Sequence, residues 1–154
     1  MASIWHTVNL TKFLDNTHDL DAIAIDVALA TSTFVPNKDD EFIDQADGDD
    51  VESGELSVSG YVRGFGGAGR HSAASNDVTN DLTNDRSKLD ATDPAVWTAL
   101  ASGETIAWAP VLHEITNDAA SILIISLDVD PDVPTNGGNV TLAFHVDGIG
   151  YIST

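Results

Sequence analysis

Short runs in which large apolar residues occupy every second position constrain the fold of this chain more than any other feature. This two-residue period is typical of a half-buried β-strand, whose successive side chains point to opposite faces. It occurs at residues 23–29 (IAIDVAL), 56–63 (LSVSGYVR), 105–115 (TIAWAPVLHEI) and 140–146 (VTLAFHV). The run 122–129 (ILIISLDV) is apolar on both faces through Ile125, which predicts the most buried strand.

Turn residues separate these runs, and no long amphipathic helical pattern lies between them. The sequence therefore predicts an all-β fold: a single-domain antiparallel β-sandwich or barrel with long acidic loops and at most one short helix. Asp147 and Gly148 are expected to form a turn, which residues 149–153 follow. Residues 1–19 are expected to form an N-terminal segment that acts as an interaction arm, and residues 20–154 the β-sandwich or barrel domain.

Local patterns add three expectations. Residues 39–45 lie in an acidic loop and have the composition of one or two helical turns. The segment 76–85 (NDVTNDLTND) repeats Asn-Asp over too short a period for a solenoid and is interpreted as extended or turning. Pro110 cannot donate to a strand ladder, so it predicts an edge strand or a bulge.

The charge of the chain excludes one large class of partner. The sequence contains 25 acidic and six basic residues, a formal net charge of -19. Because nucleic-acid binding requires clustered Lys and Arg, no nucleic-acid partner is expected. No apolar run approaches the length of a bilayer helix, so no membrane partner is expected either. The acidic surface is consistent with solubility or with a specific ligand surface, and composition leaves both open.

A glycine motif raises the question of a cofactor. Gly64, Gly66 and Gly69 in RGFGGAGRH have the G-x-G-x-x-G spacing of a dinucleotide-binding turn. That turn must open an amphipathic helix, and the following residues, RHSAASNDVTNDLTND, contain no helical stripe. The glycines therefore predict a flexible or bulged loop, and no cofactor is expected. The basic residues of this stretch, Arg63, Arg70 and His71, form the main cationic cluster of the sequence.

Metal and catalytic motifs are weak. Asp128, Asp130 and Asp132 have the spacing of the first ligands of a calcium loop, but Val133 stands where the loop needs Gly. They are weak calcium candidates, and no metal is expected.

The sequence contains no recognisable catalytic motif. No G-x-S-x-G nucleophile motif occurs, and the histidines are scattered, with His6 expected in solvent. The sequence therefore predicts a protein that is not an enzyme and has no catalytic residues.

The tryptophans differ in their expected roles. Trp97 and Trp108 are expected in the core of facing strands. Trp5, with Ile4, lies near the N-terminus, where a large apolar side chain either docks on its own domain or binds a neighbour. Both alternatives stay open.

Several stretches between about Asp21 and Ser153 share an order with a known family. Asp90, Ala91, Asp93 and Trp97 correspond to a D-A-x-D-x-x-W element, from which Pro94 and one extra residue before the Trp depart. A closing T-x-G-G … G-I hairpin is matched by Thr135, Gly137, Gly138, Gly148 and Ile149. In these elements the chain resembles a family of small virion structural proteins of tailed bacteriophages.

The resemblance implies a non-enzymatic virion protein, a capsid decoration (cement) protein that bridges and stabilises major capsid protein subunits on the outer capsid surface. It also implies self-association into a homo-oligomer such as a trimer. The alternatives are a tail or head-to-tail structural protein, or a β-sandwich receptor- or glycan-binding module with Tyr61 or Trp97 as an exposed platform. The predicted partner contacts are Ile4, Trp5, Arg63, Phe65, Arg70 and His71, and Arg70→Glu is expected to weaken attachment without unfolding the domain.

Overall fold

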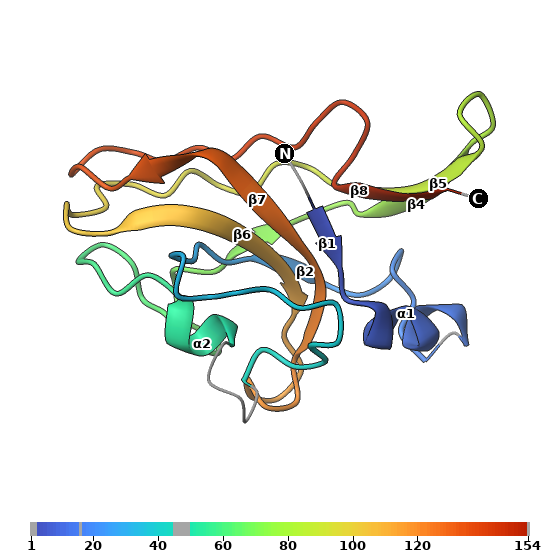
Figure 1. Cartoon of the computed structure of the whole chain (residues 1–154), viewed down its shortest axis with the longest axis horizontal. Helices are drawn as coiled ribbons and strands as arrows, with labels where there is room; N and C mark the ends of the chain where they lie inside the picture. Colours follow the sequence, from blue (N-terminus) through green and yellow to red (C-terminus); the bar gives the residue numbers. More distant parts are fainter. Residues whose placement is uncertain (1–2, 16, 45–49, 154) are drawn as a thin grey trace.

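The structure is a computed structural model that describes residues 3–15, 17–44 and 50–153 (Figure 1). Its elements are, in chain order, β1 (Ser3–Trp5), α1 (Thr7–Leu14), β2 (Ile25–Val27), α2 (Val51–Gly54), β3 (His71–Ala73), β4 (Asp77–Asp81), β5 (Arg86–Asp90), β6 (Thr105–His113), β7 (Ile122–Pro134) and β8 (Gly150–Ser153).

Two antiparallel sheets make up the fold. One has five strands in the order β1-β7-β6-β2-β3, and the other has three in the order β4-β5-β8. The small sheet lies at one end of the molecule, near β1 and α1 (Figure 1). The predicted all-β fold is confirmed, as two sheets consistent with a sandwich and not as a closed barrel. The described residues contain two short helices, one more than expected.

The core explains why residues 122–129 are apolar on both faces. β7 is buried from Ile122 to Leu127, as predicted. One cluster packs side chains of β2 and β7 against Leu89 of the small sheet. A second cluster covers Leu123 of β7 with α2 and the loops before it. Each face of this part of β7 therefore contacts a separate apolar cluster, which explains why successive residues from Ile122 to Ile125 are all apolar.

Two of the predicted strands are irregular segments instead. Residues 56–63 form a loop with one turn at residues 58–60, and residues 140–146 form a loop with isolated bridges at its ends. Their alternate apolar residues still pack against the core, as Val58 and Phe144 do. The Phe144 N–H donates to the Asp93 carboxylate at 2.7 Å. In these two segments the alternation of apolar residues reflects burial of every second side chain and not strand pairing. Side chains such as Asp93 bind backbone N–H groups that a neighbouring strand would bind in a sheet.

Of the other local predictions, one is confirmed and two are wrong. The segment 76–85 is extended and turning as expected: β4 and β5 form a hairpin around residues 82–85. Pro110 lies opposite Ser126 in β6, a central strand, so the edge prediction was wrong. Register shifts do occur near it, at Ile106/Trp108 and Val111/Leu112. The helical turns predicted within 39–45 are also wrong for residues 39–44, which form a turn and an isolated bridge, and Gln45 lies outside the described residues.

The N-terminal segment is part of the domain. β1 pairs with β7 in the register Ile4↔Ser126, and the Trp5 Nε1–H donates to the Tyr151 carbonyl at 3.2 Å. A Cβ on Gly150 would lie 2.8 Å from the Trp5 ring, so the missing side chain makes room for the indole. Of the two alternatives for Trp5, the structure shows docking on its own domain, and a role of residues 1–19 as an interaction arm stays a prediction. None of the helices in the described residues has the length and apolar content needed to cross a membrane.

Candidate interaction site at the glycine loop

The glycine loop, residues 61–70, follows α2 in the chain and leads into β3. Gly64 and Gly66 adopt positive φ angles of 87° and 66°, a conformation that costs other residues energy. A Cβ on Gly69 would lie within 2.7 Å of the Tyr61 ring. The motif is thus a tight loop closed on itself, in agreement with the predicted bulged loop, and no helix follows it.

The backbone N–H groups of the glycine loop bind carboxylates, and these carboxylates belong to side chains of the same chain. The Gly64 N–H donates to Glu55 Oε2 at 3.1 Å, and the Phe65 N–H donates to Asp118 Oδ2 at 3.1 Å. The Gly66 N–H lies 3.2 Å from each oxygen of Glu114. Three successive amides therefore bind three carboxylates, as a phosphate-binding loop binds phosphate oxygens.

Arg70 lies at the centre of these carboxylates. Its Nη2 donates to Glu55 Oε2 at 2.8 Å, and its Nη1 donates to Glu114 Oε1 at 2.7 Å and to Asp118 Oδ1 at 2.5 Å. The side chain is 1% exposed. Burial alone would lower the pKa of Arg70, but hydrogen bonds and attraction from Glu55, Asp118 and Glu114 raise it above the ordinary value.

The position of Arg70 corrects two predictions. Its guanidinium cannot contact a partner surface, because the chain's own carboxylates enclose it. For the same reason Arg70→Glu is now expected to destabilise the domain, because it would place a fourth carboxylate among Glu55, Glu114 and Asp118 and remove their guanidinium partner.

Tyr61 extends the network toward the core. Its hydroxyl donates to Glu55 Oε1 at 2.8 Å and accepts from the Leu29 N–H at 3.0 Å. Burial, and then the Glu55 charge, raises the pKa of Tyr61 well above its ordinary value. We call Arg70, Glu55, Glu114, Asp118 and Tyr61 the Arg70 network. It ties the glycine loop to the end of α2 and to the turn between β6 and β7.

His71 and Trp97 hold the other side of the loop. The two rings stack with centroids 4.5 Å apart and an interplanar angle of 4°. The Trp97 Nε1–H donates to the Gly69 carbonyl at 2.6 Å. Trp97 and Tyr61 are both buried. The exposed aromatic platform proposed for a glycan-binding module therefore does not exist at these two residues.

The outer side of the glycine loop is exposed. Phe65 is 45% exposed, Val62 is also exposed, and Arg63 lies between them in the chain. We call these three residues the loop tip. Among the described residues, Arg63 is the only lysine or arginine without an ion pair to a carboxylate. The other pairs are Lys12 with Glu41, Lys38 with Asp39, Arg70 with its three acids, Arg86 with Asp81 and Asp147, and Lys88 with Asp90.

The six predicted contact residues thus separate into two groups. Arg63 and Phe65 lie together on the surface, as a contact requires. Ile4 and Trp5 are half-buried in β1, Arg70 is enclosed, and His71 is stacked on Trp97. Sequence reasoning missed Glu55, Glu114 and Asp118, since no local pattern distinguishes them from the other 22 of the 25 acidic residues.

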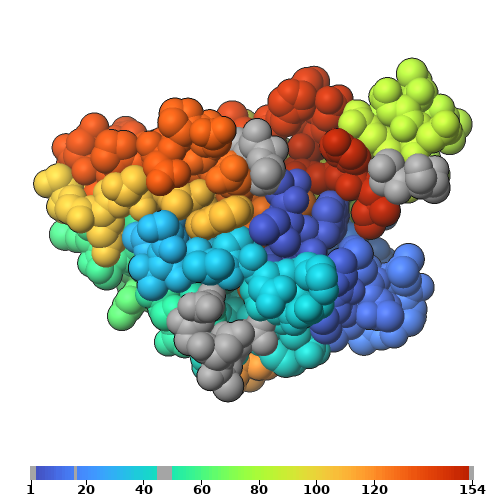
Figure 2. Space-filling model, in the orientation of Figure 1, coloured from blue at the N-terminus to red at the C-terminus, as the bar shows by residue number. Residues whose placement is uncertain are grey.

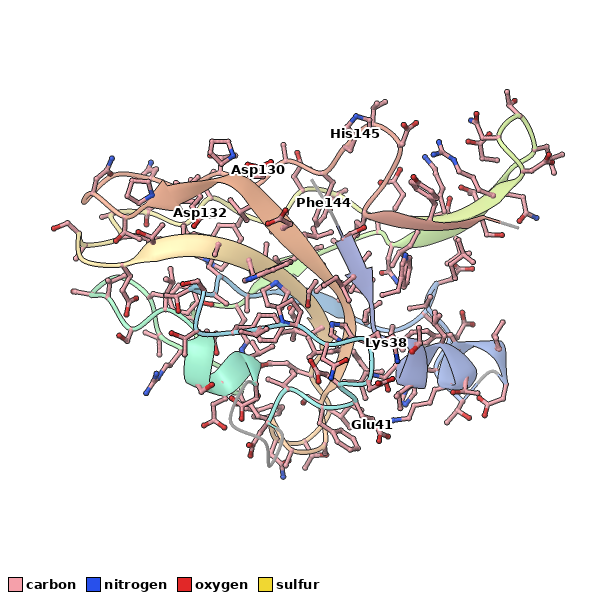
Figure 3. The ribbon with its side chains drawn as sticks, in the orientation of Figure 1. Lys38, Glu41, Asp130, Asp132, Phe144 and His145 are labelled. Carbon is pink, nitrogen blue, oxygen red and sulfur yellow. The ribbon has the colours of Figure 1, made fainter. Side chains whose placement is uncertain are left out.

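A second polar cluster lies beneath α1. His6 is buried, contrary to its predicted exposure, and its Nε2 lies 2.9 Å from Ser126 Oγ. Asn9 Nδ2 donates to the carbonyls of Glu41 and Leu123, both at 2.7 Å. Lys38 and Glu41 lie beside α1 in Figure 3. Burial lowers the pKa of His6 to about 4, although backbone groups of Asn37 and Asp40 favour the protonated ring.

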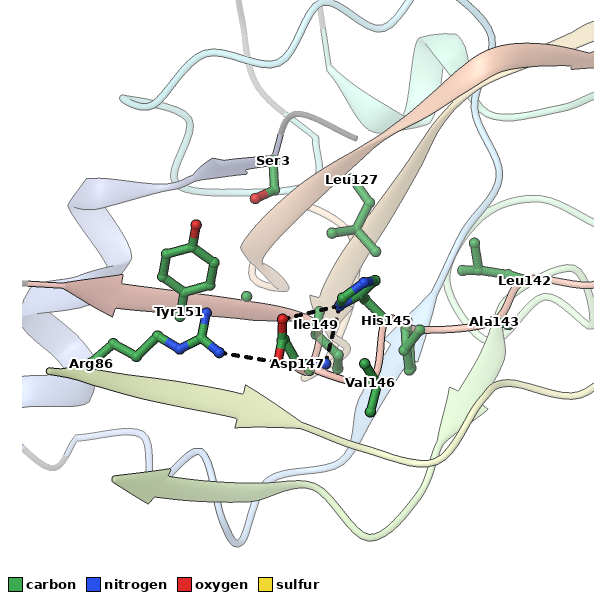
Figure 4. A pocket seen from close by; sticks show the side chains of 13 residues that line it. Ser3, Arg86, Leu127, Leu142, Ala143, His145, Val146, Asp147, Ile149 and Tyr151 are labelled. Carbon is green, nitrogen blue, oxygen red and sulfur yellow. Dashed lines mark hydrogen bonds and ion pairs between the residues drawn. The ribbon is translucent and has the colours of Figure 1, made fainter. Parts of the chain in front are cut away.

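A cavity of about 590 Å³ lies between β8 and the 142–149 loop (Figure 4). It contains Ser3, His145 and Asp147, the residue types of a nucleophile, a base and an acid. The His145 Nδ1 accepts the Asp147 backbone N–H at 3.1 Å, however. Among the described residues no hydrogen bond joins Ser3 to His145, so the three residues do not form the linked arrangement of a catalytic triad. Asp147 pairs with Arg86 at 3.1 Å, and its Oδ2 lies 3.5 Å from His145 Nδ1, with the His145 and Asp147 side chains both exposed.

The calcium candidates lie along a strand. Asp128, Asp130 and Asp132 belong to β7, where Figure 3 shows Asp130 and Asp132 spread along the ribbon. Within residues 3–15, 17–44 and 50–153, no group of three or more His, Asp or Glu side chains is placed to hold a metal ion. The three weak calcium candidates are therefore not gathered into a ligand group, because an extended backbone separates their carboxylates.

Comparison of the chain with models of protein families, with curated proteins and with solved structures finds no match. The resemblance to phage virion proteins stays a prediction.

Proposed function

We propose that this protein is a non-enzymatic structural protein of a phage virion, a capsid decoration protein that bridges and stabilises major capsid protein subunits. The proposal rests on the family resemblance and on one feature of the structure: the loop tip is held out from the domain by the buried Arg70 network. Location on the outer capsid surface and assembly as a homo-oligomer are parts of the same proposal.

The composition of the loop tip suits an anchor. An arginine between two apolar side chains is typical of residues that dominate binding energy at protein interfaces. The amides beneath the tip are bonded to Glu55, Asp118 and Glu114, so the tip loses little conformational freedom when it binds. The matching capsid surface would have an apolar pocket with a carboxylate beside it.

Charge and repetition support a bridging role. A chain with a net charge of -19 is repelled by an acidic surface except where an unpaired cation meets it. Arg63 is that cation. A single loop tip binds weakly, but a homo-oligomer would present several tips to neighbouring capsid subunits, and multivalency would then give stable attachment.

Capsid particles stripped of this protein test the proposal. We expect wild-type protein to rebind them and to raise their temperature of disruption, and Arg63→Glu combined with Phe65→Ser to abolish rebinding. Lys38→Glu combined with Val35→Ser is the matched control, because it makes the same change of charge and polarity at other exposed residues. Both double variants should melt like the wild type, since the four side chains are exposed.

Two results would count against the proposal separately. If particles with and without the protein are equally stable, it is not a cement protein. If the Arg63/Phe65 variant rebinds like the control, attachment uses another surface. Imaging of particles that carry labelled protein separates the head from the tail location, and binding to a panel of glycans would favour the receptor-binding alternative.

A further inference from the structure

An apolar groove beside Trp5, the last residue of β1, is not used by the proposed function. It has a volume of about 780 Å³ and lies between α1 and the small sheet. Figure 2 shows α1 and the β4–β5 hairpin as separate projections at the same end of the molecule. The floor of the groove includes Trp5, Phe13 and Leu89, which also pack against the main core. The core therefore fixes its shape.

Large apolar side chains around this groove are exposed. Leu14 at the end of α1 is 86% exposed, and Leu82 in the hairpin is 85% exposed. Val78 of β4 and Ile152 of β8 are exposed beside them. Residues from three separate parts of the chain thus form one apolar surface, which is characteristic of an interaction site.

Carboxylates surround the groove. Its two cations are already paired, Arg86 with Asp81 at 2.8 Å and with Asp147 at 3.1 Å, and Lys88 with Asp90 at 3.2 Å. The remaining charged residues that line it are exposed aspartates, namely Asp19, Asp21 and Asp85. The rim is therefore net negative, and it belongs to a chain with a net charge of -19.

The negative charge of the rim indicates which kind of binding partner fits the groove. A second copy of the chain would meet this negative rim with its own excess of acidic residues, so it fits this groove less well than a basic segment does. The outer edge of β4 is also partly occupied, because the Val78 N–H donates to Asp21 Oδ1 at 2.6 Å. An added β-strand therefore fits less well than an amphipathic segment that inserts apolar side chains.

We propose that the groove between α1 and the small sheet binds an apolar segment of another protein that is flanked by lysine or arginine. The apolar side chains contact Leu14, Leu82 and the groove floor, and the basic residues meet the rim aspartates. This site is separate from the loop tip and does not depend on the capsid role.

Isothermal titration calorimetry of the full chain tests the proposal with a synthetic 14-residue peptide of Leu and Lys in amphipathic helical spacing. A peptide of equal charge with Ser in place of Leu is the control ligand. We expect the wild type to bind the Leu/Lys peptide at least tenfold more tightly than the Ser/Lys peptide. Equal affinity for both peptides would show attraction by charge alone and would overturn the proposal.

Variants separate the groove from general attraction. Leu14→Asp with Leu82→Asp adds two carboxylates, so it strengthens binding that depends only on charge but weakens binding in an apolar groove. We expect at least a tenfold loss. Val35→Asp with Val146→Asp adds the same charge at exposed residues outside the groove and should not weaken binding. Unchanged affinity of the Leu14/Leu82 variant, or a wild-type dimer that this variant dissociates in sedimentation, would refute the proposal.

Discussion

Replacement of Arg70 by methionine should destabilise the domain more than any change to an exposed basic residue. Methionine has a similar length and fills the same space, but it donates no hydrogen bond. Glu55, Glu114 and Asp118 would then face one another around the side chain without a cation. The three backbone amides and the Tyr61 hydroxyl remain as donors, so the variant loses the charge and keeps part of the hydrogen bonding.

The size of the loss follows from the burial of the cluster. Removal of one partner from a buried ion pair costs about 3–5 kcal/mol, because the other charge stays buried and uncompensated. The Arg70 and Glu55 side chains are 1% and 0% exposed, so solvent screens this pair very little. A domain of this size has a total free energy of unfolding of about 5–15 kcal/mol. The melting temperature should therefore fall by about 6–20 °C.

Urea unfolding followed by tryptophan fluorescence measures the effect, since Trp97 is bonded to the glycine loop. Arg63→Met is the control, and it should change the free energy of unfolding by no more than about 0.5 kcal/mol. Arg70→Lys, which keeps the charge but loses the forked donors, should fall between them. If Arg70→Met and Arg63→Met have the same stability, the Arg70 network does not hold the loop as we infer.

Gly69→Ala should lower the urea midpoint more than Gly66→Ala, because its Cβ would lie within 2.7 Å of the Tyr61 ring, whereas Gly66 meets nothing within 4 Å. Gly66→Ala should still cost about 1–2 kcal/mol through its positive φ. The pKa of His6 is about 4 in the folded protein and 6.5 in the unfolded chain, so the folded state binds fewer protons between these pH values. The free energy of unfolding should lose about 3 kcal/mol as pH falls from 6.5 to 4, and His6→Gln should remove this part of the slope in urea titrations. Trp5→Ala should release β1, which amide hydrogen exchange would detect as loss of protection at residues 3–5 with the other strands unaffected.

Local burial explains what could be predicted. The run 122–129 identifies β7 because its apolar residues on both faces need cover on both sides, and the structure provides it. The same reasoning fails at 56–63 and 140–146, where every second residue is apolar but no strand forms. The absence of a helical pattern after Gly69 correctly predicts that no helix begins there, since β3 begins at His71.

The candidate site was predictable only in part. Arg63 and Phe65 are exposed as a contact requires, and their place in a glycine loop suggested this. Arg70, seven residues after Arg63 in the same basic stretch, is buried. Nothing in the stretch itself distinguishes the two arginines, because the difference arises from carboxylates elsewhere in the chain.

The sequence by itself determined the all-β class, the most buried strand and the loop character of the glycine motif. Each of these depends on residues close together in the chain, where alternation and turn residues act directly on the backbone. Only the tertiary structure decided which acids meet Arg70, because Glu55, Glu114 and Asp118 lie 15, 44 and 48 residues from it. Proximity of that kind arises when the strands pair and the loops close, so no local pattern of residues encodes it.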